Sequence, residues 1–174
     1  MKALILVDFE KEWTNKDSDY FVGDISDVIG RANRLIAFCR KEGYKIILTR
    51  HVEKDSNDAF APDSDNVGII ADIDKKYSDI IITKHKISPF FRTDLEKELE
   101  GIEEIVACGI LTNLCVRSLV QDAYDRDFKI TVIKDCCVAM DKEVQEFTFK
   151  DLKDTREEIE FFNLDEFIGT LKVT

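Results

Sequence analysis

A cysteine, a lysine and an aspartate in this chain have the chemistry to cleave a carbonyl compound together. Cys115 follows an apolar stretch and a glycine turn, where we expect the first turn of a helix. Unpaired N–H groups and the positive end of the helix dipole favour a thiolate there, and the same N–H groups can hold an oxyanion. Asp8 and Lys84 each directly follow another apolar stretch. A carboxylate can accept the proton of the thiol, and an ammonium group stabilises the thiolate.

The positions of these residues, at or just beyond the ends of predicted strands, indicate that they converge. Right-handed crossovers place the carboxyl ends of parallel strands on one side of a sheet, which is where ligands bind in such folds. Each residue alone also has a structural explanation: a turn for Asp8, a solvated charge for Lys84, and a small buried side chain for Cys115. The shared location of all three favours an active site.

The elements that must position these residues alternate along the chain. We expect strands over 3–7, 45–49, 78–83, 104–108, 129–133 and 158–162, and helices over 27–41, 93–99, 113–125, 142–155 and 164–171. This alternation predicts an α/β fold, a three-layer α-β-α sandwich around a six-stranded, mostly parallel sheet with Rossmann-like topology. Because no linker or repeat interrupts the pattern, we expect one domain over residues 1–174.

Composition excludes several classes of partner. The 174 residues carry a formal net charge of −11, which would repel nucleic acid and an anionic membrane surface. No apolar run approaches the roughly 20 residues of a membrane span. The chain passes from Met1 and Lys2 directly into a strand pattern, so we expect a cytoplasmic protein. Five cysteines without C-x-x-C spacing indicate reduced thiols.

Three stretches together resemble the isochorismatase-like cysteine hydrolase superfamily, which includes nicotinamidases, carbamoylsarcosine amidases and isochorismatases. They are ALILVD at 3–8, TKHKISPFFRTDL at 83–95 and GILTNLCV at 109–116, with weaker similarity as far as residue 135. The resemblance covers nearly the whole chain in the expected order. It implies a catalytic triad with Cys115 as nucleophile, Asp8 as base and Lys84 as the supporting cation.

The resemblance also implies how an oxyanion is held. A cis peptide bond would join Ile110 to Leu111, and the N–H groups of Leu111 and Cys115 would be the donors.

Aromatic residues are the candidates for the wall of the substrate pocket. Trp13 follows Asp8 by five residues, where relatives place an aromatic that lines the pocket. Phe60 and Phe91 are weaker candidates for the same wall. The alternative for Trp13 is a loop aromatic that packs onto the core.

A metal site is less well supported. Nicotinamidases of this superfamily bind a divalent metal through an Asp-x-His pair and further histidines after the second strand. This chain has Arg50-His51-Val52-Glu53 at that place and Asn57 where another histidine is expected. His51 and Glu53 are donors that suit zinc or manganese. We nevertheless expect no metal and no other cofactor, with His51 lining the pocket.

The expected function is hydrolysis of a carbon–nitrogen bond other than a peptide bond, by a nicotinamidase-like amidase acting on a small amide or carbamoyl compound through a thioester. The first alternative is isochorismatase-type vinyl-ether cleavage, although relatives with that activity commonly lack the cysteine. The second is a reactive-thiol or redox protein without amidase activity. The resemblance further implies a homo-oligomer, a dimer or larger, in which a neighbour's loop completes the pocket.

Overall fold

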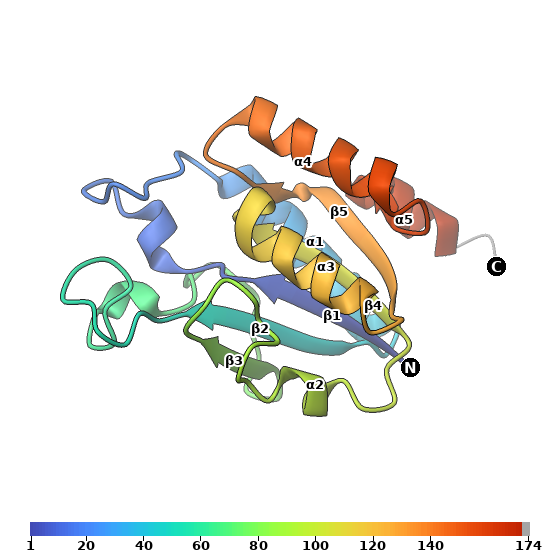
Figure 1. Ribbon diagram of the computed structural model, residues 1–174, viewed down its shortest axis with the longest axis horizontal. Helices are drawn as coiled ribbons and strands as arrows, with labels where there is room; N and C mark the ends of the chain where they lie inside the picture. Colours follow the sequence, from blue (N-terminus) through green and yellow to red (C-terminus); the bar gives the residue numbers. More distant parts are fainter. Residues whose placement is uncertain (172–174) are drawn as a thin grey trace.

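The chain folds around a six-stranded sheet whose strands all run parallel. The computed structural model describes residues 1–171 (Figure 1). The strands are β1 (Lys2–Val7), β2 (Lys45–His51), β3 (Ile80–Lys84), β4 (Glu104–Ile110), β5 (Lys129–Val138) and β6 (Glu160–Phe162). Their order is β3-β2-β1-β4-β5-β6, and every neighbouring pair is parallel. The predicted fold class is confirmed, and the strand order reverses between β1 and β4, the place where open α/β sheets bind ligands.

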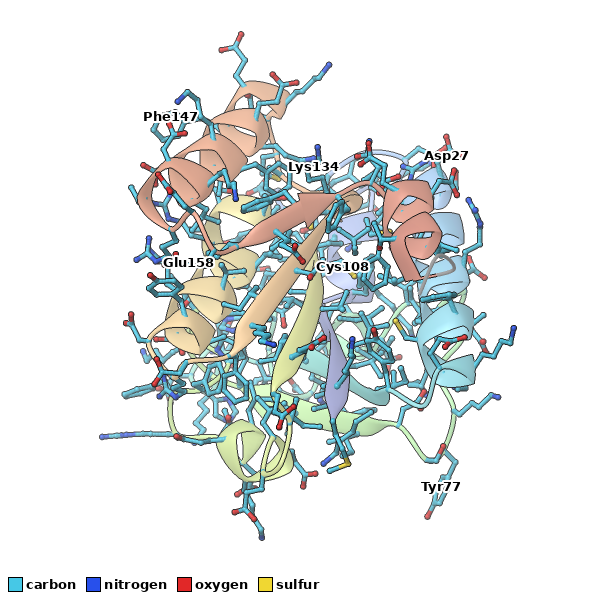
Figure 2. All side chains as sticks on the ribbon, turned by 90° about the vertical axis from the view of Figure 1, so that its right-hand side faces the viewer. Asp27, Tyr77, Cys108, Lys134, Phe147 and Glu158 are labelled. Carbon is cyan, nitrogen blue, oxygen red and sulfur yellow. The ribbon has the colours of Figure 1, made fainter. Side chains whose placement is uncertain are left out.

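Helices cover both faces of this sheet. Helices α1 (Ser26–Lys41) and α5 (Leu164–Leu171) lie on one face, and α3 (Arg117–Tyr124) and α4 (Lys142–Thr155) on the other. Figure 2 shows the sheet between these two layers, with Cys108 of β4 near the middle. The short α2 (Leu95–Glu98) precedes β4. Within residues 1–171, every helix is too short or too polar to cross a membrane.

The central position of β1 in the sheet explains why its sequence is continuously apolar. Residues 3–7 of β1 are all fully buried, because β1 is paired on both edges and covered by helices on both faces. The edge strands β3 and β6 are more exposed. The 3-10 helices η1 (Lys11–Thr14) and η2 (Asp65–Val67) belong to the loops that follow β1 and β2 at the carboxyl edge.

Strand β5 is longer than its sequence predicts. We expect an end at residue 133, but the strand continues to Val138 and includes Cys136 and Cys137, both buried. A register shift between Ala107 and Gly109 of β4 accommodates the extra length. Asp135 is tolerated inside the strand because its carboxylate accepts the backbone N–H of Leu164 at 2.9 Å.

Candidate active site

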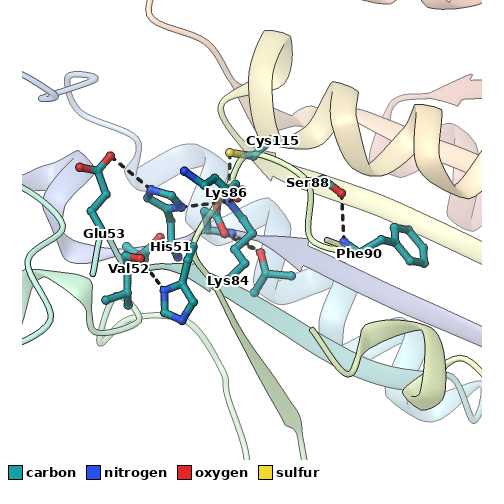
Figure 3. A network of polar contacts seen from close by, with 12 residues as sticks. His51, Val52, Glu53, Lys84, Lys86, Ser88, Phe90 and Cys115 are labelled. Carbon is teal, nitrogen blue, oxygen red and sulfur yellow. Dashed lines mark hydrogen bonds and ion pairs between the residues drawn. The ribbon is translucent and has the colours of Figure 1, made fainter. Parts of the chain in front are cut away.

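The ammonium group of Lys84 lies between the carboxylate of Asp8 and the thiol of Cys115. Lys84 Nζ is 2.8 Å from Asp8 Oδ2 and 3.2 Å from Cys115 Sγ, and Figure 3 shows the lysine beneath the sulfur. Asp8 and Lys84 are fully buried, and Cys115 is 9% exposed. Asp8 follows β1, Lys84 ends β3, and Cys115 follows β4. Strands far apart in sequence therefore bring the three side chains to one point at the carboxyl edge of the sheet.

Asp8 is held by its backbone and by the neighbouring strand. Its φ of 51° lies in the left-handed region, which is costly for a residue other than glycine. The N–H of Asp8 bonds to the carbonyl of Thr49, and Thr49 Oγ1 donates to Asp8 Oδ1 at 2.5 Å. Because Thr49 satisfies Oδ1, the other carboxylate oxygen faces Lys84.

Gly109 allows β4 to pass close to β1 immediately before the site. Its φ is +140°, and a Cβ at this position would lie 2.1 Å from the carbonyl oxygen of Val7. Only glycine fits both the conformation and the space. This close approach brings the segment that carries Cys115 next to Asp8.

Cys115 lies in a π-helical turn, η3 (Thr112–Val116), and not in the first turn of an α-helix as the sequence predicts. The N–H of Val116 bonds to the carbonyl of Leu111, five residues earlier, at 3.1 Å. The α-helix begins only at Arg117. The peptide bond between Ile110 and Leu111 is cis, as the resemblance implies. π-helical turns of this kind occur frequently at functional sites.

The resting thiol is protonated, which corrects the expectation of a thiolate. Burial, followed by the charge of Asp8, raises the pKa of Cys115 to about 12, and Lys84 only partly offsets these two effects. Burial alone would lower the pKa of Lys84, but the Asp8 carboxylate and then Cys115 raise it above its ordinary value. The site therefore combines a thiol and an ammonium group with a carboxylate that can accept a proton.

A comparison with known proteins identifies the family of this chain. The family model described as "Isochorismatase domain" matches residues 2–159. The chain belongs to the isochorismatase family. The Bacillus subtilis isochorismatase family protein YddQ is 23% identical over 147 residues, which cover 83% of this chain and 81% of that protein. Nicotinamidase 3 of Arabidopsis thaliana is 22% identical over 165 residues, 86% of this chain and 79% of that protein.

A solved structure shows the same fold. The pyrazinamidase of Pyrococcus horikoshii in complex with zinc superposes with a TM-score of 0.82 at 23% identity, over 93% of this chain and 98% of that chain.

His51 and Glu53, the candidate metal ligands, form only a pair. His51 Nε2 lies 3.5 Å from Glu53 Oε1, and His51 Nδ1 lies 3.5 Å from Lys84 Nζ (Figure 3). In the part of the chain that the structure describes, no three His, Cys, Asp or Glu side chains are grouped so that they could hold a metal ion. Burial and then the charge of Lys84 lower the pKa of His51, so its ring is neutral and accepts from the ammonium. This donor set does not fit a metal centre.

The three candidate pocket aromatics do not form one wall. Trp13 and Phe60 are buried together, with ring centroids 5.1 Å apart, and Phe60 lies 5.4 Å from the ring of His51. Phe91 is half exposed and lines a separate groove of about 840 Å³ beside Leu114, the residue before Cys115. Phe60 thus packs between Trp13 and His51, whereas Phe91 lines a groove together with the residue that precedes Cys115.

Two residues of the site were missed in the sequence. Thr49 ends the apolar stretch of β2 and lies next to Asp8 only because β1 and β2 pair. Glu10 is fully buried, and its Oε2 accepts the backbone N–H of His51 at 2.8 Å. The signal for Thr49 in the sequence was its place as the polar last residue of the strand predicted over 45–49. For Glu10, the signal was an acid two residues after Asp8.

Proposed function

We propose that the protein is a cysteine hydrolase that cleaves the C–N bond of a small amide or carbamoyl compound, with nicotinamidase-like chemistry. The observation that carries this proposal is the position of Lys84 Nζ, 2.8 Å from the carboxylate of Asp8 and 3.2 Å from the sulfur of Cys115. In this assignment Cys115 is the nucleophile, Asp8 is the base, and Lys84 is the cation that supports both.

In the first half of the reaction, Cys115 Sγ attacks the carbonyl carbon of the substrate. The S–C bond forms as the thiol proton passes to Asp8, and the carbonyl electron pair moves to oxygen. The N–H groups of Leu111 and Cys115 are the proposed donors to this oxyanion. The thiol does not need to be ionised beforehand, because Asp8 accepts its proton as the bond forms. Lys84 stays an ammonium group and offsets the negative charge throughout.

The oxyanion then collapses and the C–N bond breaks. Asp8 returns its proton to the leaving nitrogen, ammonia or an amine departs, and a thioester remains on Cys115. A water molecule attacks the thioester, gives a proton to Asp8, and forms a second oxyanion. When the C–S bond breaks, the sulfur recovers the proton and the acid product leaves. These reaction steps need no oxidant, reductant or cofactor.

The names of two relatives support the substrate class. Nicotinamidase 3 and the Pyrococcus pyrazinamidase are named for amides, and we carry that class over to this chain as part of the proposal. Cys115, buried against Lys84, favours amide cleavage over isochorismatase-type vinyl-ether cleavage, the alternative in the same family. The raised pKa of Cys115 also disfavours a freely reactive thiolate with a redox role.

The test is ammonia release from nicotinamide, pyrazinamide, carbamoyl and ureido compounds by the parent protein and by Cys115→Ala. We expect at least one compound to be hydrolysed, loss of turnover in the variant, and an acyl adduct on Cys115 in the mass spectrum of rapidly quenched enzyme. Full turnover by Cys115→Ala, or ammonia release from none of the compounds, would overturn the proposal.

A further inference from the structure

Glu10 places a second carboxyl group beside the candidate triad, and one of its two oxygens has no hydrogen-bond partner among residues 1–171. The side chain is fully buried, and Oε2 accepts the N–H of His51 at 2.8 Å. Within residues 1–171, Oε1 is buried and has no hydrogen-bond partner. Buried polar atoms almost always have partners, so an exception this close to the reacting groups calls for a physical reason.

The charged groups around Glu10 come from the ends of three strands. Asp8 follows β1, Arg50 and His51 end β2, and Lys84 ends β3. His51 is the register partner of Lys84, and its Nδ1 lies 3.5 Å from Lys84 Nζ. A chain of contacts therefore runs from the Glu10 carboxyl through the backbone and ring of His51 to the ammonium group that touches Cys115.

The carboxyl group of Glu10 is neutral at physiological pH. Burial, followed by the charge of Asp8, raises its pKa to about 9, and the opposing effects of the His51 N–H, Lys84 and Arg50 are smaller. Because Oε2 accepts the N–H of His51, Oε1 is the oxygen available to carry the acidic proton. An ionised Glu10 would be a second carboxylate near Lys84, and its charge would oppose both the thiolate and the oxyanion.

We propose that Glu10 is a positioning residue of this site: as a neutral carboxylic acid it holds His51 against Lys84 and leaves Asp8 as the carboxylate that pairs with that lysine. This inference deepens the proposed function and rests on it for the identity of the nucleophile. Its consequence is that ionisation of Glu10 at alkaline pH suppresses the reactivity of Cys115.

The test compares Glu10→Gln, which keeps an acceptor for His51 and is neutral at every pH, with the parent protein. The rate of alkylation of Cys115 by iodoacetamide is followed by peptide mass spectrometry from about pH 6 to about pH 10.5. The ratio of the two alkylation rates near pH 7, where both side chains are neutral, is the reference for the ratio at higher pH. Above about pH 9, the variant is expected to react about 3- to 10-fold faster than the parent. This is the effect of a Cys115 thiol whose pKa is lower by about 0.5 to 1 in the variant. Glu12→Gln, which alters another buried acid, should follow the parent profile.

Two further measurements do not depend on alkylation. A carboxyl ¹³C resonance of the glutamate-labelled protein should titrate near pH 9 and be missing from Glu10→Gln. The amide hydrogen of His51 should exchange at least about 10-fold faster in Glu10→Leu, which has no acceptor, than in Glu10→Gln.

A variant-to-parent alkylation ratio that is constant across this pH range, or a Glu10 resonance that titrates below about pH 6, would overturn the inference. None of these measurements needs an amide substrate. Failure to release ammonia would therefore count against the proposed function and leave this result intact.

Discussion

Thr49 decides which oxygen of Asp8 meets the lysine. Its hydroxyl donates to Asp8 Oδ1 at 2.5 Å and also lies 3.2 Å from the N–H of Asp8, so it bonds to the backbone and the side chain of one residue. The remaining oxygen, Oδ2, pairs with Lys84. A threonine inside β2 thus orients the proposed base, which directly follows the neighbouring strand β1.

Replacing this threonine tests the orienting role. In Thr49→Val, which keeps the shape, Asp8 loses a charge-assisted hydrogen bond worth about 1.5–3 kcal/mol. We expect kcat to fall by about 10- to 100-fold if that energy is lost in the transition state. Thr148→Val is the matched control, because Thr148 is also buried and its hydroxyl donates to the carbonyl of Val144 within α4. Equal kcat values for both variants would contradict the role of Thr49.

The buried ion pair makes a separable prediction about stability. Lys84→Met leaves the Asp8 carboxylate buried without its cation, and breaking such a pair costs about 3–5 kcal/mol. We expect urea denaturation to show a loss of this size together with loss of turnover. Adding Asp8→Asn removes the uncompensated charge, so the double variant should recover much of the free energy of unfolding but no activity. If Lys84→Met alone is as stable as the parent, the pair does not have the assigned charges.

Gly109 is expected to tolerate no side chain. In Gly109→Ala, the added Cβ would collide with the carbonyl oxygen of Val7. The alanine would also have to adopt a φ of +140°, which is unfavourable for a residue with a Cβ. The two penalties together predict a loss of about 2–5 kcal/mol. Gly30→Ala is the control, because Gly30 lies in α1 with nothing near the added Cβ, and helix propensity predicts a gain of about 0.5–1 kcal/mol. Thermal melts of both variants that shift in the same direction would contradict this prediction.

The raised pKa of Glu10 makes stability depend on pH. Its folded value is about 9 against an ordinary 4.5. The folded state therefore retains a proton that the unfolded state loses, and the stability it contributes below about pH 4.5 is lost as the pH rises towards 9. Because glutamine does not titrate, the melting temperature of Glu10→Gln minus that of the parent should increase steadily between about pH 4.5 and 9. If this difference in melting temperature does not change with pH, Glu10 is charged in the folded protein.

Removal of metal ions is expected to leave turnover unchanged. In residues 1–171, His51 and Glu53 are not joined by a third His, Cys, Asp or Glu side chain placed to bind a metal with them. Dialysis against EDTA followed by assay of ammonia release, with and without added zinc, measures this directly. If EDTA abolishes activity and added zinc restores it, the enzyme needs a metal ion and this prediction is wrong.

Much of the architecture follows from local sequence. The apolar run at residues 3–7 predicts a strand covered on both faces, and β1 is such a strand. Asp8 and Lys84 stand where apolar runs end, so parallel strand order alone placed them at the same edge. The stretch from Gly109 to Val116 carries the resemblance that implied Cys115 and the cis bond. These features depend on residue types within a few positions of one another.

The remaining features depend on segments that meet only in the folded chain. Thr49 touches Asp8, and Glu10 touches His51, across 41 residues of sequence in each case. The π-helical turn around Cys115 replaced the predicted α-helical start. The protonated state of the thiol, opposite to the expectation, follows from burial and from the charge of Asp8. Sequence by itself determined which groups lie at the edge of the sheet. Their distances and ionisation states were decided by tertiary structure, because desolvation and electrostatic fields are set by every segment that packs around a group.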